Sequence, residues 1–160
     1  MKKLAFILSL MVFIAACGDN NDTRSGSNSD QFDSTAVVKN DENPAYDPHR
    51  GEGKFKKIDL GADVDEALAS NGEKVYSVKC SGCHKTTEEK LVGPGWKGVT
   101  SRHAPEWIMN FITNTDEMLN KDPKAQAQLE ICLVRMPNQN LTDNDARSLL
   151  EYMRRNDGTK

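Results

Sequence analysis

The residues that decide the fold are Cys80-Ser81-Gly82-Cys83-His84. Two thiols lie three positions apart, and an imidazole follows the second thiol directly. Each thiol can add to one vinyl group of a haem, while the adjacent histidine reaches the iron from the same side. The spacing therefore predicts one covalently attached c-type haem, bound through Cys80 and Cys83, with His84 as an iron ligand.

Two other readings of this pattern use the same residues. A zinc site needs four ligands, and no second close pair accompanies the motif, since Cys132, His49 and His103 stand alone. A dithiol redox motif normally lies at a strand-to-helix junction, and no strand pattern precedes Cys80. Haem attachment remains the favoured interpretation.

The composition sets limits on size and class. At 160 residues the chain has room for one domain with extensions. Its net charge of -3 excludes a generally basic nucleic-acid binder. A hydrophobic content of only 37% suggests that part of the chain does not pack into a core.

The N-terminus has the pattern of an export signal. Lys2 and Lys3 precede an apolar run of 13 residues, 4–16, which is shorter than the ~20 needed to span a bilayer. The run ends in Ile14-Ala15-Ala16-Cys17, which resembles the lipobox of bacterial lipoproteins. We therefore expect a signal peptide over 1–16 and acylation of Cys17, which would anchor the mature protein to a membrane. The alternative is an ordinary signal with a coincidental cysteine.

Two segments are expected between this anchor and the domain. Residues 17–43 are rich in Asp, Asn, Ser, Gly and Thr, so they should form a flexible tether. Residues 44–62 contain Tyr46, Phe55, Ile58 and Leu60 between turn residues. These apolar anchors suggest an extended arm that packs across the domain, although more linker is the other possibility.

Residues 63–160 are predicted to form an all-α domain of about four helices without strands. The helices are expected over 64–80, 104–113, 123–134 and 142–156. The residues assigned to their buried faces are Val64, Leu68, Val75, Tyr76, Val78, Trp107, Ile108, Phe111, Ile112, Leu129, Cys132, Leu133, Leu149, Leu150, Tyr152 and Met153. Gly72 interrupts the first helix, which a close helix crossing would explain. Cys132, the one cysteine without a role, is expected in the core because Ile131, Leu133 and Val134 adjoin it.

The iron needs a sixth ligand or an open site, and Met136 is the best candidate for the ligand. Pro137 ends the third predicted helix, so Met136 lies on an irregular segment that can face the iron opposite His84. Met118 is the second candidate. Spacing alone does not separate a ligand from an ordinary core methionine.

The ordered set of motifs resembles the small monohaem class I cytochromes c over residues 64–157. Gly72 and Tyr76 match the crossing in the first helix, and Leu149 and Tyr152 match the last helix. The other matching features are Cys80, Cys83 and His84, Gly93-Pro94, Met136-Pro137 and Leu141-Thr142. The resemblance implies the cytochrome c fold around one covalent haem c. It also implies that the Pro94 carbonyl orients His84, that Trp96 lies at the haem site, and that Met136 is an axial ligand.

Some parts depart from the family pattern, namely the Trp96 region, the long middle over 104–134 and the N-terminal extension. The lipobox, the arm sequence Tyr46-Asp47-Pro48-His49-Arg50-Gly51 and the Met136–Gln139 loop together look similar to lipoprotein cytochromes that accompany nitrous oxide reductase in Bacteroidetes-like bacteria. This similarity implies a lipid-anchored protein facing the periplasm, on the inner or outer membrane of a Gram-negative bacterium.

The expected function is one-electron transport in respiration. Filled axial positions exclude a substrate from the iron, and His/Met ligation raises the reduction potential. A quinol-oxidising complex is the expected donor, and a reductase such as nitrous oxide reductase the expected acceptor. A basic rim predicted to bind an acidic redox partner consists of Lys74, Lys79, Lys85, Lys90, Lys97 and Arg102.

Two alternatives keep the haem but change its use. In a haem enzyme or a gas or redox sensor, Met136 would be labile, with His103 as the only distal candidate and more simply a surface residue. In a fixed subunit of a larger oxidoreductase, the domain would not move between partners. The flexible tether favours a mobile carrier.

Overall fold

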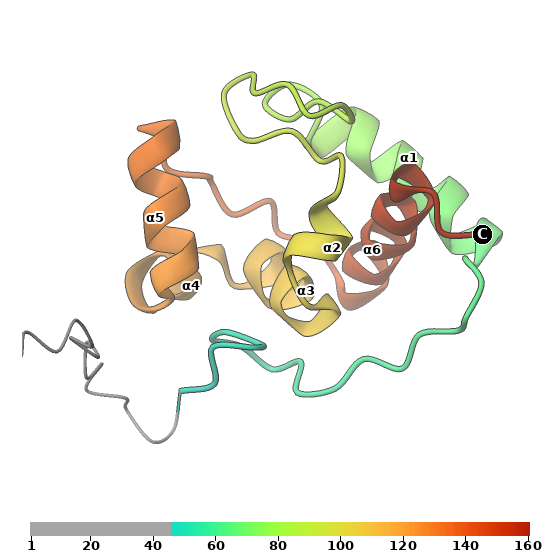
Figure 1. The fold of residues 1–160 in the computed structure, drawn as a ribbon, viewed down its shortest axis with the longest axis horizontal. Helices are drawn as coiled ribbons and strands as arrows, with labels where there is room; N and C mark the ends of the chain where they lie inside the picture. The colour runs from blue at the N-terminus through green and yellow to red at the C-terminus, as the bar shows by residue number, and fades with distance from the viewer. Residues whose placement is uncertain (1–45) are drawn as a thin grey trace, which may run out of the picture. The chain divides into compact units, whose positions relative to one another are not determined.

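Two helices that are far apart in the sequence pack against each other: α1 (Glu66–Lys79) and α6 (Asp143–Asp157). Gly72 and Ser148 meet at this crossing, where a Cβ atom on Gly72 would lie 2.1 Å from the carbonyl oxygen of Ser148. Only glycine lets the two backbones approach so closely, which confirms the expectation from Gly72. Figure 1 shows the two helices side by side.

This computed structural model describes residues 46–160, which form one compact unit. The predicted signal peptide (1–16), the lipidated Cys17 and the tether (17–43) lie outside the described residues. Among the helices that are described, none is long and apolar enough to cross a membrane.

The remaining helices are α2 (Val99–Arg102), α3 (Pro105–Thr113), α4 (Thr115–Lys121) and α5 (Pro123–Cys132). Residues 46–160 therefore form an all-α fold, with one isolated bridge between His84 and Lys90 and no strand. The prediction of four helices was too low, because α2 is a single turn and α4 follows α3 after only Asn114. Elements this short carry too little periodicity to be recognised from sequence.

Local chemistry explains where the main helices start and end. The Asp65 side chain accepts from the N–H of Leu68 at the start of α1, and Thr142 and Asp145 form a complete capping box at the start of α6. Pro123 occupies the first turn of α5, where its missing N–H costs nothing. These caps explain why the predicted helix bounds were close to the observed ones.

Several residues assigned to buried faces are in fact exposed. Val78 and Leu133 each keep 84% of their surface exposed. The buried residues of α1 are instead Ala69 and Gly72, because the close approach of α6 leaves room only for small side chains. Leu133 adopts a left-handed conformation that ends α5 and turns its side chain outward.

The segment 46–62 packs across the domain, along α3 and toward the start of α1 (Figure 1). The side chain of Asn110, which is fully buried in α3, accepts from the N–H of Phe55 and donates to the carbonyls of Arg50 and Phe55. At the start of the segment, the Tyr46 hydroxyl donates to Asp122. Further along, the segment also contacts α6, because Arg147 donates to the carbonyl of Asp59 and Arg154 to the carbonyl of Gly61.

Candidate haem site

The attachment motif follows the C-terminus of α1 as a tight turn. Cys80 ends the helix with its N–H bonded to the carbonyl of Tyr76, and the N–H groups of Cys83 and His84 both donate to the carbonyl of Cys80. The turn places Cys80 inward and Cys83 outward. Burial raises the pKa of the Cys80 thiol to about 11.

The zinc alternative gains no support from this arrangement. No group of three or more His, Cys, Asp or Glu side chains that could hold a metal ion occurs within residues 46–160. A structural zinc site needs four such ligands, so the described part of the chain does not offer one.

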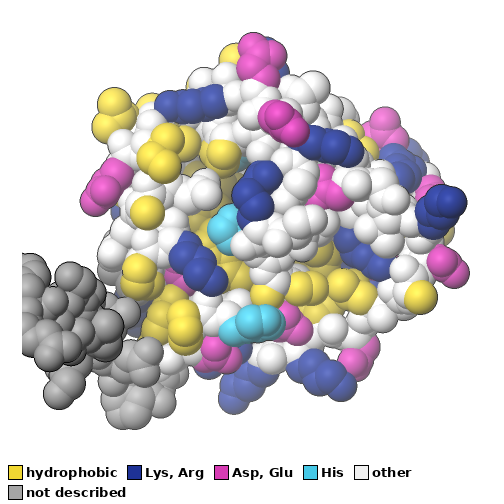
Figure 2. All heavy atoms as spheres, viewed as in Figure 1, with side chains coloured by type: hydrophobic (Ala, Val, Ile, Leu, Met, Phe, Trp, Pro, Cys, Tyr) yellow, Lys and Arg dark blue, Asp and Glu magenta, His cyan; other side chains and the backbone are white. Residues whose placement is uncertain are grey.

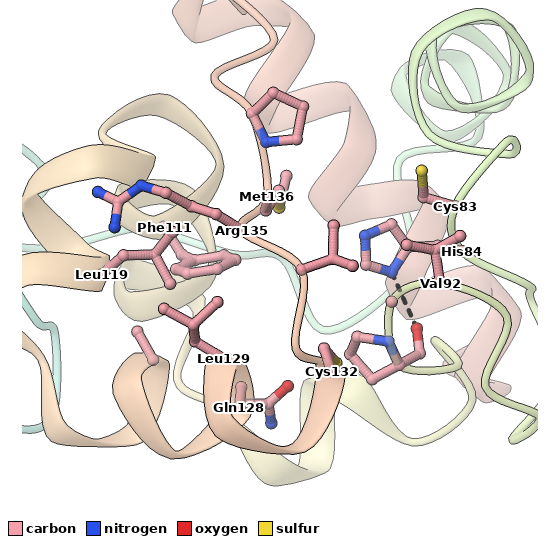
Figure 3. A pocket seen from close by; sticks show the side chains of 15 residues that line it. Cys83, His84, Val92, Phe111, Leu119, Gln128, Leu129, Cys132, Arg135 and Met136 are labelled. Carbon is pink, nitrogen blue, oxygen red and sulfur yellow. Dashed lines mark hydrogen bonds between the residues drawn. The ribbon is translucent and has the colours of Figure 1, made fainter.

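The His84 ring is oriented by the loop that follows it. Its Nδ1 lies 2.9 Å from the carbonyl oxygen of Pro94 (Figure 3, dashed line). Burial lowers the pKa of His84, while the hydrogen bond to Pro94 acts in the opposite direction. A neutral ring that donates from Nδ1 leaves the lone pair of Nε2 available for a metal.

Gly93 provides the space for this ring. A Cβ atom on Gly93 would lie 2.3 Å from Cε1 of His84, which is closer than real contacts allow. The Tyr76 hydroxyl holds the same residue from behind by donating to the His84 carbonyl at 2.7 Å. Sequence and fold thus agree on Gly93-Pro94 as the support of His84.

Trp96 lies behind the histidine. It is buried, with its ring 4.8 Å from the Tyr76 ring and 5.7 Å from the His84 ring, measured between centroids. It also lines two of the cavities described next. The structure therefore brings the predicted residues Cys80, Cys83, His84, Pro94 and Trp96 into one region.

Three adjoining cavities lie between His84 and Met136, and both residues line all three. Figure 3 shows how Met136 reaches this space from the irregular segment after α5, while His84 reaches it from the attachment loop. Met118 does not line these cavities; it is fully buried beneath residues 51 and 52, where its sulfur accepts from the N–H of Glu52 at 3.0 Å. The structure separates the two candidate methionines, which the sequence did not.

The chemistry of the cavity walls fits a haem. Most lining side chains are apolar and come from every part of the domain, including Val92, Phe111, Ile112, Leu119, Leu129, Leu141, Leu149 and Met153. An imidazole and a thioether face an apolar space beside two cysteines, and these groups match a flat apolar ring with iron at its centre and two vinyl groups at one edge. The residues present therefore fit this cofactor.

A polar edge of the site was missed by the sequence analysis. Arg102 and Gln128 line both an inner cavity and an outer hollow of about 490 Å³, which is also lined by Lys90, Lys97 and Glu88. No hydrogen bond of the Gln128 amide occurs among residues 46–160. The carboxylates of a haem are its only anionic groups, and a cation with an amide donor suits them. Isolated polar residues in a helix carry no sequence signal for such a role.

His103 and Cys132 were placed wrongly from sequence. His103 is not a surface residue: it is half-buried, stacks on Trp107 with ring centroids 4.0 Å apart, and lines a cavity. Its buried Nδ1 has no hydrogen-bond partner in the described range 46–160, and burial lowers its pKa to about 4. Cys132 is not a core residue: it is half-buried on the wall of the site, and its apolar neighbours are exposed.

The six cations assigned to a basic rim are mostly engaged in contacts. Figure 2 shows one face of the molecule, on which Lys and Arg side chains are spread among acidic and uncharged groups. Lys85 pairs with Glu89, and Arg102 donates to the carbonyls of Gly95 and Lys97. Lys79, Lys90 and Lys97 each donate to a backbone carbonyl, those of Gln139, Ile131 and Asn156 respectively. These carbonyl contacts leave the positive charges in place, so the prediction of an acidic partner stays open.

Comparisons with known proteins agree with this geometry. The family model for cytochrome c matches residues 69–157. Cytochrome c-551 of Bacillus subtilis is 36% identical over 61 residues, which cover 38% of this chain and 54% of that protein, so the match spans about half of the curated relative.

Two solved structures are similar over most of their length. Cytochrome c from Rhodothermus marinus is 31% identical, with a TM-score of 0.64, and the match covers 68% of this chain and 92% of that one. An engineered form of that protein, bound to a carbene intermediate, is also 31% identical, with a TM-score of 0.60 over 66% of this chain and 90% of that one.

Proposed function

Since the chain belongs to the cytochrome c family, an electron-transfer family with covalent haem c, we propose that it is a one-electron carrier with both axial positions of the iron filled by its own residues. In this proposal Cys80 and Cys83 hold the haem, and His84 and Met136 are the axial ligands. The observation that carries it is that His84 and Met136 line the same three cavities from two separate segments.

Each of these residues has a definite task. The Pro94 carbonyl keeps the Nδ1 proton of His84 in place, so that Nε2 faces the cavity as a base. Met136 supplies a soft thioether from the other segment. When bound, the haem supplies a one-electron couple, which a thioether ligand and burial shift toward higher potential.

The walls of the site have two further tasks. Apolar side chains such as Phe111, Leu119 and Leu129 exclude water from the cavity. Arg102 and Gln128 would hold the carboxylate edge of the cofactor where the cavity opens to the outer hollow. The site thus orients the cofactor by its apolar and its anionic edges.

We also propose that the protein is held at a membrane through an acylated Cys17 and faces the periplasm. The tether would join the domain at Tyr46, whose hydroxyl donates to Asp122 at the N-terminus of α5. Cys132, which lines the cavity, lies at the other end of the ten-residue α5, about 15 Å away along the helix axis.

The partners that suit this role are a quinol-oxidising complex as donor and a respiratory reductase, such as nitrous oxide reductase, as acceptor. The basic rim of Lys74, Lys79, Lys85, Lys90, Lys97 and Arg102 would steer an acidic partner. Electron exchange with the true partner should then slow as salt rises, because surface charges are screened beyond a Debye length of ~8–10 Å. Rates independent of salt would contradict the role of the rim.

Optical spectra of the purified, haem-loaded protein test the central proposal. The wild type should show the weak far-red absorption of a methionine bound to ferric iron and should not bind carbon monoxide when reduced. Met136→Ala should lose this absorption and bind the gas, whereas Met118→Leu should behave as the wild type. If the reduced wild type binds carbon monoxide at once, the sixth position is open and a haem enzyme or sensor becomes the better account.

A further inference from the structure

Two lysines flank the attachment motif, one on each side. Lys79 is the last residue of α1, directly before Cys80, and Lys90 lies in the loop between His84 and Pro94. The Lys79 ammonium donates to the carbonyl oxygen of Gln139 at 2.8 Å. The Lys90 ammonium donates to the carbonyl oxygen of Ile131, also at 2.8 Å.

The two acceptors lie on either side of Met136: Ile131 is in the last turn of α5, just before the segment that carries Met136, and Gln139 is within that segment. Ile131 precedes Met136 by five residues, and Gln139 follows it by three. The two hydrogen bonds therefore join the two sides of the cavity, the side of His84 and the side of Met136, on both flanks of the methionine. Neither link is local in sequence, since the residues joined are 60 and 41 positions apart.

The Met136 segment has little structure of its own to hold it. No helix or strand is present between Cys132 and Asp143. The side-chain bonds inside this segment are short-range, from the Gln139 amide to the Pro137 carbonyl and from the N–H of Asn140 to Asn138. Such bonds shape the loop but do not fasten it to the rest of the domain. The Arg135 guanidinium fastens its start to α4, by donating to Asp116 and Asn120, but not to the side of His84.

The two carbonyl oxygens, those of Ile131 and Gln139, are suitable hydrogen-bond acceptors for a lysine ammonium. The carbonyl of Ile131 is in the last turn of α5, where carbonyls lack a partner within the helix and a positive charge is favourable. Gln139 lies in the loop, so its carbonyl has no ladder partner either. Both contacts are exposed, so each is weak on its own, and their effect comes from acting at two ends of one flexible segment.

We propose that Lys79 and Lys90 are positioning residues that close the site by fastening the Met136 segment to the attachment loop. This inference rests on the proposed function, because it assumes that Met136 binds the iron. Loss of either hydrogen bond should free one end of the segment and raise the fraction of molecules in which Met136 has left the iron.

The test uses the full-length, haem-loaded protein with Lys79→Met, Lys90→Met and the double variant. Methionine keeps the length and apolar stem of lysine but cannot donate. Lys74→Met is the matched control, because Lys74 is an exposed lysine of α1 whose ammonium has no partner within residues 46–160. The readouts are the rate of carbon monoxide binding to the reduced protein and the temperature at which the far-red absorption of the oxidised protein disappears.

We expect each single variant to bind carbon monoxide about two- to fivefold faster than the wild type, and the double variant to exceed either one. The far-red absorption should disappear at a lower temperature, while Lys74→Met and the arginine variants Lys79→Arg and Lys90→Arg stay near the wild type. Denaturant unfolding followed by circular dichroism should change little, since the helices are not involved.

Unchanged rates in all lysine variants, together with a normal far-red absorption in the wild type, would overturn this inference and leave the proposed function intact. If carbon monoxide binds faster only in variants whose denaturant unfolding midpoint is also lowered, the cause is a general loss of stability, and the inference is likewise overturned. A wild type without the far-red absorption would instead contradict the ligation by Met136.

Discussion

The Nδ1 atom of His84 and the carbonyl oxygen of Pro94 lie 2.9 Å apart, and the residue between Pro94 and Val92 is a glycine whose missing side chain makes this possible. The contact fixes which nitrogen of His84 faces the cavity. Because Nδ1 is held by this contact, Nε2 is the nitrogen left to face the cavity, which is the orientation that an iron ligand needs.

Gly93→Ala should disturb this orientation. The added methyl group would lie 2.3 Å from Cε1 and 2.7 Å from Nδ1 of His84, so the ring or the loop must move. We expect a higher reduction potential, because an imidazole that loses its hydrogen-bond acceptor is a weaker base, and a lower yield of haem-loaded protein. Voltammetry checks the first effect. Gly82→Ala is the control, since its Cβ would meet nothing within 4 Å.

Gly72→Ala should destabilise the whole domain. Its Cβ would lie 2.1 Å from the backbone carbonyl of Ser148, which cannot rotate away, so α1 and α6 must separate. We expect a loss of about 2–3 kcal/mol or more in the free energy of unfolding, measured by denaturant titration. Val78→Ala, in the same helix but 84% exposed, should cost less than about 0.5 kcal/mol. Similar losses in both variants would argue against the crossing as the limiting contact.

Gln128→Leu and Arg102→Leu should make the reduction potential more dependent on pH. Both residues line the place where the inner cavity meets the cation-lined hollow. In the proposed function these two side chains hold the carboxylates of the haem. Removing a hydrogen-bond donor or a positive charge raises the pKa of a haem carboxylate, so its protonation would fall within the range of pH 5–8 and would change the reduction potential there. Potentials measured across this range provide the check. Gln126→Leu, on the exposed side of α5, should leave the profile unchanged.

The stability of the protein should fall as the pH drops from about 6.5 to about 4 in a manner that depends on His103. Burial lowers its pKa to about 4, with Arg102 and Lys124 acting in the same direction and Asp122 opposing them. The unfolded chain therefore binds this proton first, so the folded state loses stability as the pH falls over that interval. His103→Phe keeps an aromatic ring against Trp107 and should lose less stability over the same interval. Parallel curves of unfolding midpoint against pH for both proteins would contradict this origin.

Local patterns were sufficient to predict the main features of this fold. The all-α class, the Gly72 crossing and the caps at Asp65 and Thr142 depend on neighbours within a few residues or on a single small side chain. The attachment motif likewise points to the cofactor, because two thiols and an imidazole at that spacing suit its chemistry. The short helices α2 and α4 were not predicted, because one or two turns are too short to show the hydrophobic periodicity of a helix.

The choice between Met136 and Met118, both plain methionines in the sequence, required the fold. Met118 is buried under the segment 46–62, and Met136 lines the cavities with His84. The fold was also needed to show that Val78 and Leu133 are exposed and that Cys132 and His103 are half-buried. It was needed as well to show that Arg102 and Gln128 line the edge of the cavity.

By itself, the sequence determined the helical class and the cofactor, and it predicted the residues proposed to attach it, because these depend on periodicity, capping and spacing along the chain. Only the tertiary structure decided which methionine faces His84, which polar groups edge the cavity and which lysines join its two sides. Those relationships connect residues tens of positions apart, and their distances are set by how the helices pack.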